Sequence, residues 1–219
     1  MLTIANQILG TGQLSLAKCL VMTADETNHL TTHNIPELWM YMLQRIDLGR
    51  EVHFYTNTTI DTLDYSGTSL NTGSKVVLAA YGEMIRELAT EVPACLQHLQ
   101  YFERPVLVMP GVIALQAKPF ENYQAAAKEM EILNTLLQNS IDTMQTVPML
   151  IICDDAGFVS ERLNNFLWIA FTRCNPSHDL YGIGSSTINK HWGCSGPLVF
   201  DARTKPHHAP PVVKHAATE

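Results

Sequence analysis

The stretch Met149-Leu150-Ile151-Ile152-Cys153-Asp154-Asp155 is an apolar run that ends in two acids, and Leu20-Val21-Met22-Thr23-Ala24-Asp25-Glu26 has the same form. A continuous apolar run of this length is typical of a strand that is covered on both faces, as in an α/β sheet. The acids that follow are suited to capping the helix that comes next. These two stretches therefore predict an α/β fold.

The two stretches are parts of a longer repeat. Asp25 and Asp154 lie 129 residues apart, and the same offset separates two tryptophans further along the chain. The residues that mark the repeat most clearly are Trp39 and Arg45 in the first copy, and Trp168 and Arg173 in the second. We interpret the chain as two tandem related units with these four residues as the signature of the repeat.

Each unit is expected to follow its first strand with a helix and a second strand. Apolar periodicity predicts helices that start at Pro36 and at about Ser160, and second strands at 51–56 and 180–183. This order favours a parallel pair of strands with a crossover helix, so we expect mainly parallel sheets. Further elements expected ahead of the second unit's core strand are strands at 104–109 and 112–117 and a helix at 122–139.

The predicted organisation has three segments: a first unit at 1–92, a second unit at 93–205 and a Pro/His-rich extended tail at 206–219. At the offset of 129, Met1 aligns with Met130, inside a predicted helix. The first unit is therefore expected to be N-terminally incomplete, without a counterpart of residues 104–129. Its core strand would need a neighbour from elsewhere in the chain, from a partner subunit or from a longer protein.

Composition narrows the class of protein. The 219 residues carry a formal net charge of −7, which argues against a nucleic-acid partner. No apolar run approaches the roughly 20 residues of a membrane span, and no signal peptide is expected. The five cysteines are scattered and none forms a CxxC pair, so we expect reduced thiols in the cytoplasm.

The acidic turns are the first candidates for chemistry. Asp25, Glu26, Asp154 and Asp155 follow apolar strands, where α/β sheets bind ligands, and paired carboxylates there could hold Mg²⁺. Helix capping and solvated turns are the favoured alternative. No Gly-rich phosphate loop follows either strand, so a dinucleotide site is not expected.

Other reactive residues give weaker signals. Cys194 lies near His191 and could be a nucleophile, but the Gly, Ser and Pro around it favour a structured turn. Lys18 follows Ser15 in a Ser-x-x-Lys pair, although a strand follows where a nucleophile pair needs a helix. At the mouth of a strand, Lys18 could still face an anionic ligand.

Several of these segments resemble the C-terminal domain of UbiD-type decarboxylases. In the first unit the resemblance lies in Lys18-Cys19-Leu20-Val21-Met22-Thr23-Ala24-Asp25, Leu38-Trp39, Arg45-Ile46-Asp47 and Gly73-Ser74-Lys75. In the second it lies in Leu150-Ile151-Ile152-Cys153-Asp154-Asp155, Leu167-Trp168, Thr172-Arg173-Cys174-Asn175-Pro176 and His178-Asp179. The matches follow one order over nearly the whole chain.

The resemblance implies a role without chemistry of its own. The family decarboxylates 3-polyprenyl-4-hydroxybenzoate and related acids, with prenylated FMN, Mn²⁺ and K⁺ bound by a central domain that carries an Arg and two Glu. No segment here matches that domain, so we expect no catalytic or metal-binding residue and no cofactor in this chain. The family's C-terminal domain mediates dimer or higher assembly and moves against the cofactor domain, and Lys18 matches a lysine that faces substrate in some members.

The expected function is therefore the assembly and interdomain part of a prenylated-FMN-dependent, non-oxidative aromatic acid decarboxylase of quinone biosynthesis. In isolation the chain should be inactive. Two alternatives stay open: a free-standing α/β interaction subunit that binds a separate catalytic subunit, and a small metal-dependent enzyme that uses Asp154 and Asp155.

Overall fold

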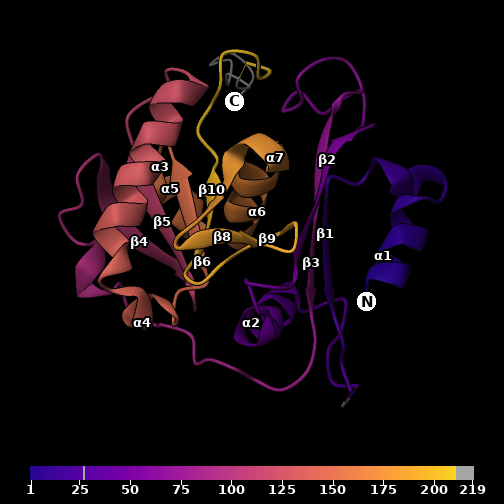
Figure 1. Cartoon of the computed structure of the whole chain (residues 1–219), viewed down its shortest axis with the longest axis horizontal. Coiled ribbons are helices and arrows are strands. Elements are labelled where there is room, and N and C mark those ends of the chain that lie inside the picture. The colour runs from indigo at the N-terminus through magenta and orange to yellow at the C-terminus, as the bar shows by residue number, and fades with distance from the viewer. Residues whose placement is uncertain (27, 211–219) are drawn as a thin grey trace, which may run out of the picture.

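The computed structural model describes residues 1–26 and 28–210, which form two sheets with helices between and outside them (Figure 1). The strands of the first sheet, in spatial order, are β1 (Cys19–Thr23), β3 (Gly73–Ala80) and β2 (Val52–Thr58). Those of the second are β4 (Phe102–Met109), β5 (Val112–Ala117), β6 (Met149–Cys153), β10 (Leu198–Asp201) and β7 (Leu180–Gly182). A separate hairpin pairs β8 (Ser185–Ile188) with β9 (His191–Cys194).

The helices complete a layered α/β structure, as predicted. They are α1 (Leu2–Leu9), α2 (Ile35–Arg45), α3 (Tyr123–Gln138), α4 (Ile141–Met144), α5 (Ala156–Glu161), α6 (Leu163–Thr172), α7 (Pro176–Asp179) and two 3₁₀ turns, η1 (Gly12–Leu16) and η2 (Ala94–Leu96). Across Figure 1 the layers run from α3 to the five-stranded sheet, to α6 and α2, to the three-stranded sheet, and finally to α1. The structure thus alternates helices with sheets.

Local sequence explains where several helices begin and end. The side chain of Asn34 caps α2 by accepting a hydrogen bond from the backbone N–H of Glu37, and Pro36 occupies the first turn. Asn122 caps α3 in the same way. The helix expected from about Ser160 is instead two helices, because Arg162 has an extended backbone that separates α5 from α6.

The prediction of mainly parallel sheets is wrong. In the first sheet β3 lies between β1 and β2, and it pairs parallel to β1 but antiparallel to β2. The second sheet repeats this arrangement, with β10 parallel to β6 and antiparallel to β7. The strand after each crossover helix therefore runs against the first strand, and the parallel partner is the following strand in the chain. Apolar periodicity carries no information about strand direction, so it could not show this.

The two sheets share one pairing register. Cys19 pairs with Val76 in the first sheet as Met149 pairs with Leu198 in the second. On the other side of the central strand, Val52 pairs with Leu78 as Leu180 pairs with Phe200. This common pattern supports a tandem repeat, while the boundary between residues 92 and 93 stays a prediction.

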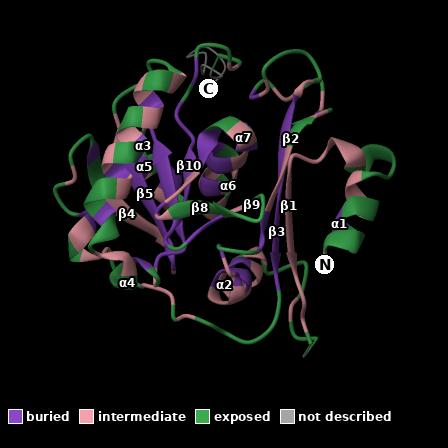
Figure 2. Ribbon diagram, viewed as in Figure 1, coloured by how far each residue is buried: buried purple, intermediate pink, exposed green. Residues whose placement is uncertain are grey.

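A single central core joins the two sheets. Trp39 and Leu43 of α2 lie in it together with Phe166 of α6, between Leu78 of one sheet and Phe200 of the other. The ring of Trp39 meets that of Phe166 edge-on at a centroid distance of 5.7 Å. Figure 2 shows the buried residues concentrated in the strands and inner helices. Neither predicted unit therefore encloses a complete core of its own.

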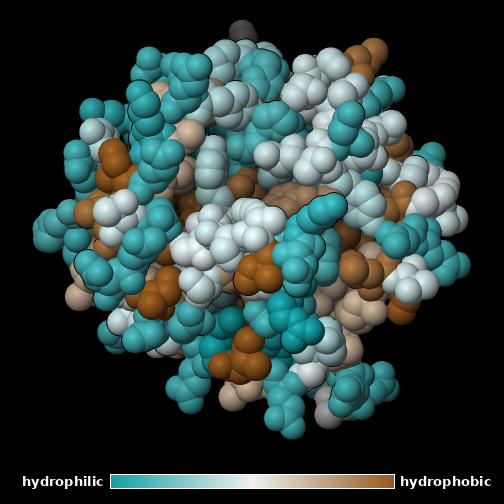
Figure 3. All heavy atoms as spheres, viewed as in Figure 1, coloured by the Kyte–Doolittle hydropathy of each residue, from teal (hydrophilic) through white to brown (hydrophobic). Residues whose placement is uncertain are grey.

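Separate apolar clusters cover the outer faces of the sheets. α3 packs Met130, Leu133 and Leu137 on the five-stranded sheet, and α1 packs Ala5 on β3 of the other sheet. On the molecular face shown in Figure 3, hydrophobic residues form small separate groups among hydrophilic ones. This face therefore shows no broad apolar patch among the described residues drawn in colour.

Candidate functional site

Lys18 enters β1 beside a carboxylate. Its Nζ lies 2.8 Å from Oδ2 of Asp64 and donates to Oγ of Ser66 at 2.7 Å, and 8% of its side chain is exposed. Burial alone would raise the pKa of Asp64, but the charge of Lys18 and hydrogen bonds from Lys18 and Ser66 hold that pKa below its ordinary value. The β2–β3 loop thus supplies the counter-ion for Lys18, which is not a free cation.

A cavity of about 400 Å³ lies beside this ion pair. Lys18 and Asp64 form its polar end, and Trp39, Leu167 and Phe171 form an apolar wall. The cavity therefore lies between the first strand of one predicted unit and the helix of the other. It suits an apolar or aromatic group, whereas an anion would have to compete with the carboxylate of Asp64 for Lys18.

The acidic turns have structural partners. Asp154 accepts hydrogen bonds from Arg173 Nη1 at 2.9 Å and from the backbone N–H and hydroxyl of Thr204 at 2.9 and 2.8 Å. Asp155 caps α5 through the backbone N–H of Phe158 at 3.1 Å. Asp155 therefore has the capping role that was expected, while Oδ2 of Asp154 holds Arg173 and Thr204 in place.

In the first unit the equivalent turn is also tied locally. Asp25 accepts a hydrogen bond from the backbone N–H of Leu30 at 2.7 Å, and its other oxygen lies 3.1 Å from His29 Nδ1. Glu26 is exposed. Across residues 1–26 and 28–210, no group of three His, Cys, Asp or Glu side chains could hold a metal ion. Asp154 and Asp155 do not belong to such a group, and a metal-dependent reaction there stays a prediction.

The repeat signature residues lie in different environments. Trp39 is 4% exposed in the central core, whereas Trp168 is 62% exposed on the outer side of α6. Arg45 stacks on the ring of Tyr41, with its guanidinium carbon 3.5 Å from the ring centroid, while Arg173 pairs with Asp154. Positions that correspond in the sequence repeat therefore have different contacts in the structure.

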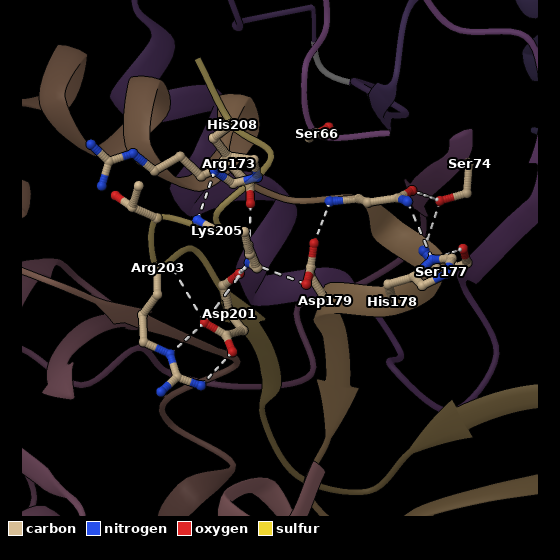
Figure 4. A network of polar contacts seen from close by, with 12 residues as sticks. Ser66, Ser74, Arg173, Ser177, His178, Asp179, Asp201, Arg203, Lys205 and His208 are labelled. Carbon is tan, nitrogen blue, oxygen red and sulfur yellow. Dashed lines mark hydrogen bonds and ion pairs between the residues drawn. The ribbon is translucent and has the colours of Figure 1, made fainter. Parts of the chain in front are cut away.

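The structure also contains a buried ionic cluster that the sequence did not predict (Figure 4). Arg203 makes a bidentate contact with the carboxylate of Asp201, with N–O distances of 2.9 and 2.6 Å, and lies 2.8 Å from Glu129 of α3. Lys205 Nζ lies 3.1 Å from Asp179 of α7 and donates to the carbonyl of Asp201. The charged groups on β10 and in the segment after it thus join α3 to α7.

Burial and ion pairing act in opposite directions on the pKa values of this cluster. The side chains of Asp201, Arg203, Lys205 and Asp179 are each at most 1% exposed. Burial raises the pKa of Asp179 more than the nearby Lys205 lowers it. For Arg203 burial works in the lowering direction, but hydrogen bonds and charge from Asp201 and Glu129 raise its pKa above the ordinary value. Arg203 therefore stays charged inside the fold.

The chain beyond the cluster turns back on itself. The backbone N–H of His208 donates to the carbonyl of Lys205 at 3.0 Å, and the N–H of Lys205 donates to His208 Nδ1 at 3.2 Å. Residues 206–208 therefore form a turn where the sequence predicted an extended tail. The rest of that predicted tail, residues 211–219, lies outside the described residues.

His208 predicts an acid-sensitive step in stability. Burial, followed by the positive charge of Lys205, lowers the pKa of His208 to about 3. The folded protein thus binds this proton more weakly than the unfolded chain, so stability present above the ordinary histidine pKa of 6.5 falls as pH drops below it. We expect His208→Asn to reduce the loss of stability between about pH 7 and about pH 5, measured by urea unfolding.

The control for this prediction is His33→Gln. His33 is exposed in the loop before α2. This variant should keep the full pH dependence of the unmodified chain. The same pH dependence in the His208 variant as in the unmodified chain would contradict the prediction. His53, whose pKa is lowered by burial and by His191, contributes a pH dependence that both variants retain.

The environment of Cys194 does not favour a nucleophile. All five cysteines are free. Cys194 is buried, its Sγ lies 3.3 Å from the carbonyl oxygen of Gly196, and burial raises its pKa to about 12. The thiolate needed for attack is therefore strongly disfavoured. Cys194 ends the strand β9, so the turn expected around it is confined to the bend at Ser195 and Gly196 before β10.

The described residues do not fit the cofactors that the family resemblance implies. Among them no Gly-rich phosphate loop follows a strand, and no group of three His, Cys, Asp or Glu side chains could hold a metal ion. We therefore derive no step through a flavin or a metal ion on this chain. Within the part of the chain that the structure describes, no helix is both long and apolar enough to cross a membrane.

Comparison with known proteins shows which family the sequence is similar to. Residues 1–80 match the model of the 3-octaprenyl-4-hydroxybenzoate carboxy-lyase C-terminal domain. The chain is 30% identical over 211 residues to a Chlamydia pneumoniae protein whose name describes it as a subunit of 4-hydroxybenzoate decarboxylase, covering 94% of this chain and 33% of that protein.

Two further relatives are uncharacterized proteins. The protein of Chlamydia caviae is 28% identical over 92% of this chain and 32% of its own length, and that of Chlamydia trachomatis serovar D is 29% identical over 98% and 34%. The chain thus spans about a third of the length of these curated relatives. No solved structure matches the chain. The resemblance predicted from the sequence is confirmed for residues 1–80, which match the C-terminal domain of the UbiD-type decarboxylases.

Proposed function

We propose that this chain is the assembly and interdomain part of a UbiD-type decarboxylase. The observation that carries the proposal is the match of residues 1–80 to the carboxy-lyase C-terminal domain, together with a relative named as part of a decarboxylase. The reaction would be the non-oxidative decarboxylation of an aromatic acid such as 3-polyprenyl-4-hydroxybenzoate, in the cytoplasm and in quinone biosynthesis. Prenylated FMN, Mn²⁺ and K⁺ would be bound by another part of the assembly.

The site geometry supports a role in packing. Two buried cations of the described residues are paired with carboxylates: Lys18 with Asp64, and Arg203 with Asp201. The thiols of Cys153 and Cys194 have pKa values raised by burial to about 12. A contact between Lys18 and substrate stays a proposal from the resemblance, and it requires Asp64 to give way. Homo-oligomer formation is likewise proposed for the full assembly.

The first test is activity of the purified chain. Supplied with prenylated FMN, Mn²⁺, K⁺ and 4-hydroxybenzoate, it should release no CO₂ above a sample without protein, because the described residues form no metal site. The same assay with the cofactor-bearing part of a UbiD-type decarboxylase serves as the positive control. Turnover by the chain without that part would overturn the proposal.

A second candidate function is a free-standing interaction subunit of a separate catalytic subunit. The name of the Chlamydia pneumoniae relative favours it, because that name describes one subunit of a decarboxylase. The two candidates differ in how the cofactor-bearing part is joined. If that part and this chain co-purify as separate polypeptides and decarboxylate together, the subunit interpretation holds; if activity requires one continuous polypeptide, the domain interpretation holds.

A further inference from the structure

Among the described residues, the strand β1 has one unpaired edge. On its other edge the backbone N–H of Val76 donates to the carbonyl of Lys18 at 3.0 Å, and that of Ala24 donates to Ala80 at 3.3 Å. Backbone groups alternate along a strand, so those of Cys19, Val21 and Thr23 point away from β3. Within the described ranges no residue pairs with them, because the strand order of this sheet ends at β1.

In the second sheet the corresponding edge is occupied. The common register makes Cys19 and Val21 the counterparts of Met149 and Ile151 in β6. β5 runs parallel to β6 on that edge and pairs Val112 with Met149 and Ala114 with Ile151. The chain itself therefore shows what this type of edge binds: a parallel strand of aliphatic residues.

The side chains beside the β1 edge leave room for such a strand. Val112 and Ala114 of β5 lie in the central core, on the same side of their sheet as Met149 and Ile151. Cys19 and Val21, the counterparts on β1, pack against the same core and also line the cavity of about 400 Å³ bounded by Trp39, Leu167 and Phe171. A strand added in the register of β5 would direct alternate side chains toward this cavity.

We propose that the free edge of β1 binds an extended aliphatic segment of a partner polypeptide, parallel to β1 and in the register that β5 has on β6. The backbone groups of Cys19, Val21 and Thr23 would pair with it, and small apolar side chains would enter the cavity. A second copy of this chain fits less well, because two β1 strands related by a two-fold axis would pair antiparallel. This binding depends on the fold alone, whatever reaction the assembly catalyses.

A peptide with the sequence of residues 110–119 is the probe, since it contains β5 and a lysine for solubility. Labelled with a fluorophore, it should bind the full chain saturably by fluorescence anisotropy. In the native pair the N–H of Met149 donates to the carbonyl of Gly111, so the odd-numbered residues of β5 face β6. N-methylation at Ile113 should therefore weaken binding at least about tenfold, whereas N-methylation at Ala114 should change it by less than about twofold.

Variants of the chain locate the site. Val21→Pro removes the N–H that faces the free edge and should abolish peptide binding, while Val21→Ala shortens the same side chain, keeps the N–H and should retain binding. Thermal melting checks that both variants fold. If Val21→Pro does not fold, the two methylated peptides still test the binding site on the unmodified chain. No saturable binding, equal effects of the two methylations, or a dimer of the chain that Val21→Pro dissociates would overturn it.

Discussion

Replacing Asp201 by alanine is expected to lower the free energy of unfolding by roughly 3–5 kcal/mol. The substitution removes the carboxylate that Arg203 holds in a bidentate contact and that lies 4.0 Å from Lys205 Nζ, and it leaves both buried cations with fewer partners. Both cationic side chains are at most 1% exposed, so water cannot replace the lost contact without opening the structure. Urea unfolding followed by circular dichroism measures the change.

The matched control is an ion pair on the surface. Glu161 and Arg162 lie 3.8 Å apart with 58% and 75% of their side chains exposed. Glu161→Ala should change the free energy of unfolding by less than about 1 kcal/mol. If Asp201→Ala costs no more than this surface variant, the ionic cluster does not hold the segment after β10 in place.

The second large effect concerns the two tryptophans that the repeat aligns. Trp39→Ala should lower the free energy of unfolding by roughly 3–5 kcal/mol, because it leaves a cavity in the core that the two sheets share. Trp168→Ala should cost less than about 1 kcal/mol, since 62% of Trp168 is exposed. Both variants lose the same side chain at positions with the same sequence signature.

The measurement is denaturant unfolding of the unmodified chain and the two variants. If the free energy of unfolding has the same dependence on denaturant concentration in all three, the midpoints report stability. Trp39 also contacts Phe171 at a centroid distance of 5.7 Å, so near-ultraviolet circular dichroism should change on its loss. Similar costs for the two substitutions would mean that Trp168 is covered in solution. That outcome would point to a partner surface on the outer side of α6.

The buried strands could be predicted because their physics is local. β6 is buried at every position and must be apolar throughout, so the run Met149–Cys153 predicted its bounds. α3 could be found for a similar reason, since Met130, Leu133 and Leu137 repeat with the helical period. In both cases the residues that need covering are close together in sequence.

The ionic cluster could not be predicted in this way. Asp201 ends β10, and Arg203 and Lys205 follow it in alternation with other residues, a pattern that usually marks a solvated segment. Their burial depends on Glu129 and Asp179, which reach the cluster from α3 and α7. The exposure of Trp168 is easier to predict from the sequence, because the apolar stripe of α6 runs through Phe166 and Ala170 and leaves position 168 outside.

The shared core has a consequence for how this sequence can vary. α2 and α6 bury Trp39 and Phe166 against each other, so a change of volume in one is felt directly by the other. The substitutions tolerated near residue 39 should therefore depend on the side chains near residue 166. We expect the two halves of the chain to change together during evolution. Covariation across relatives should accordingly link residue 39 of α2 with residue 166 of α6. Position 168 should show weaker covariation, because Trp168 is exposed and lies outside the shared core.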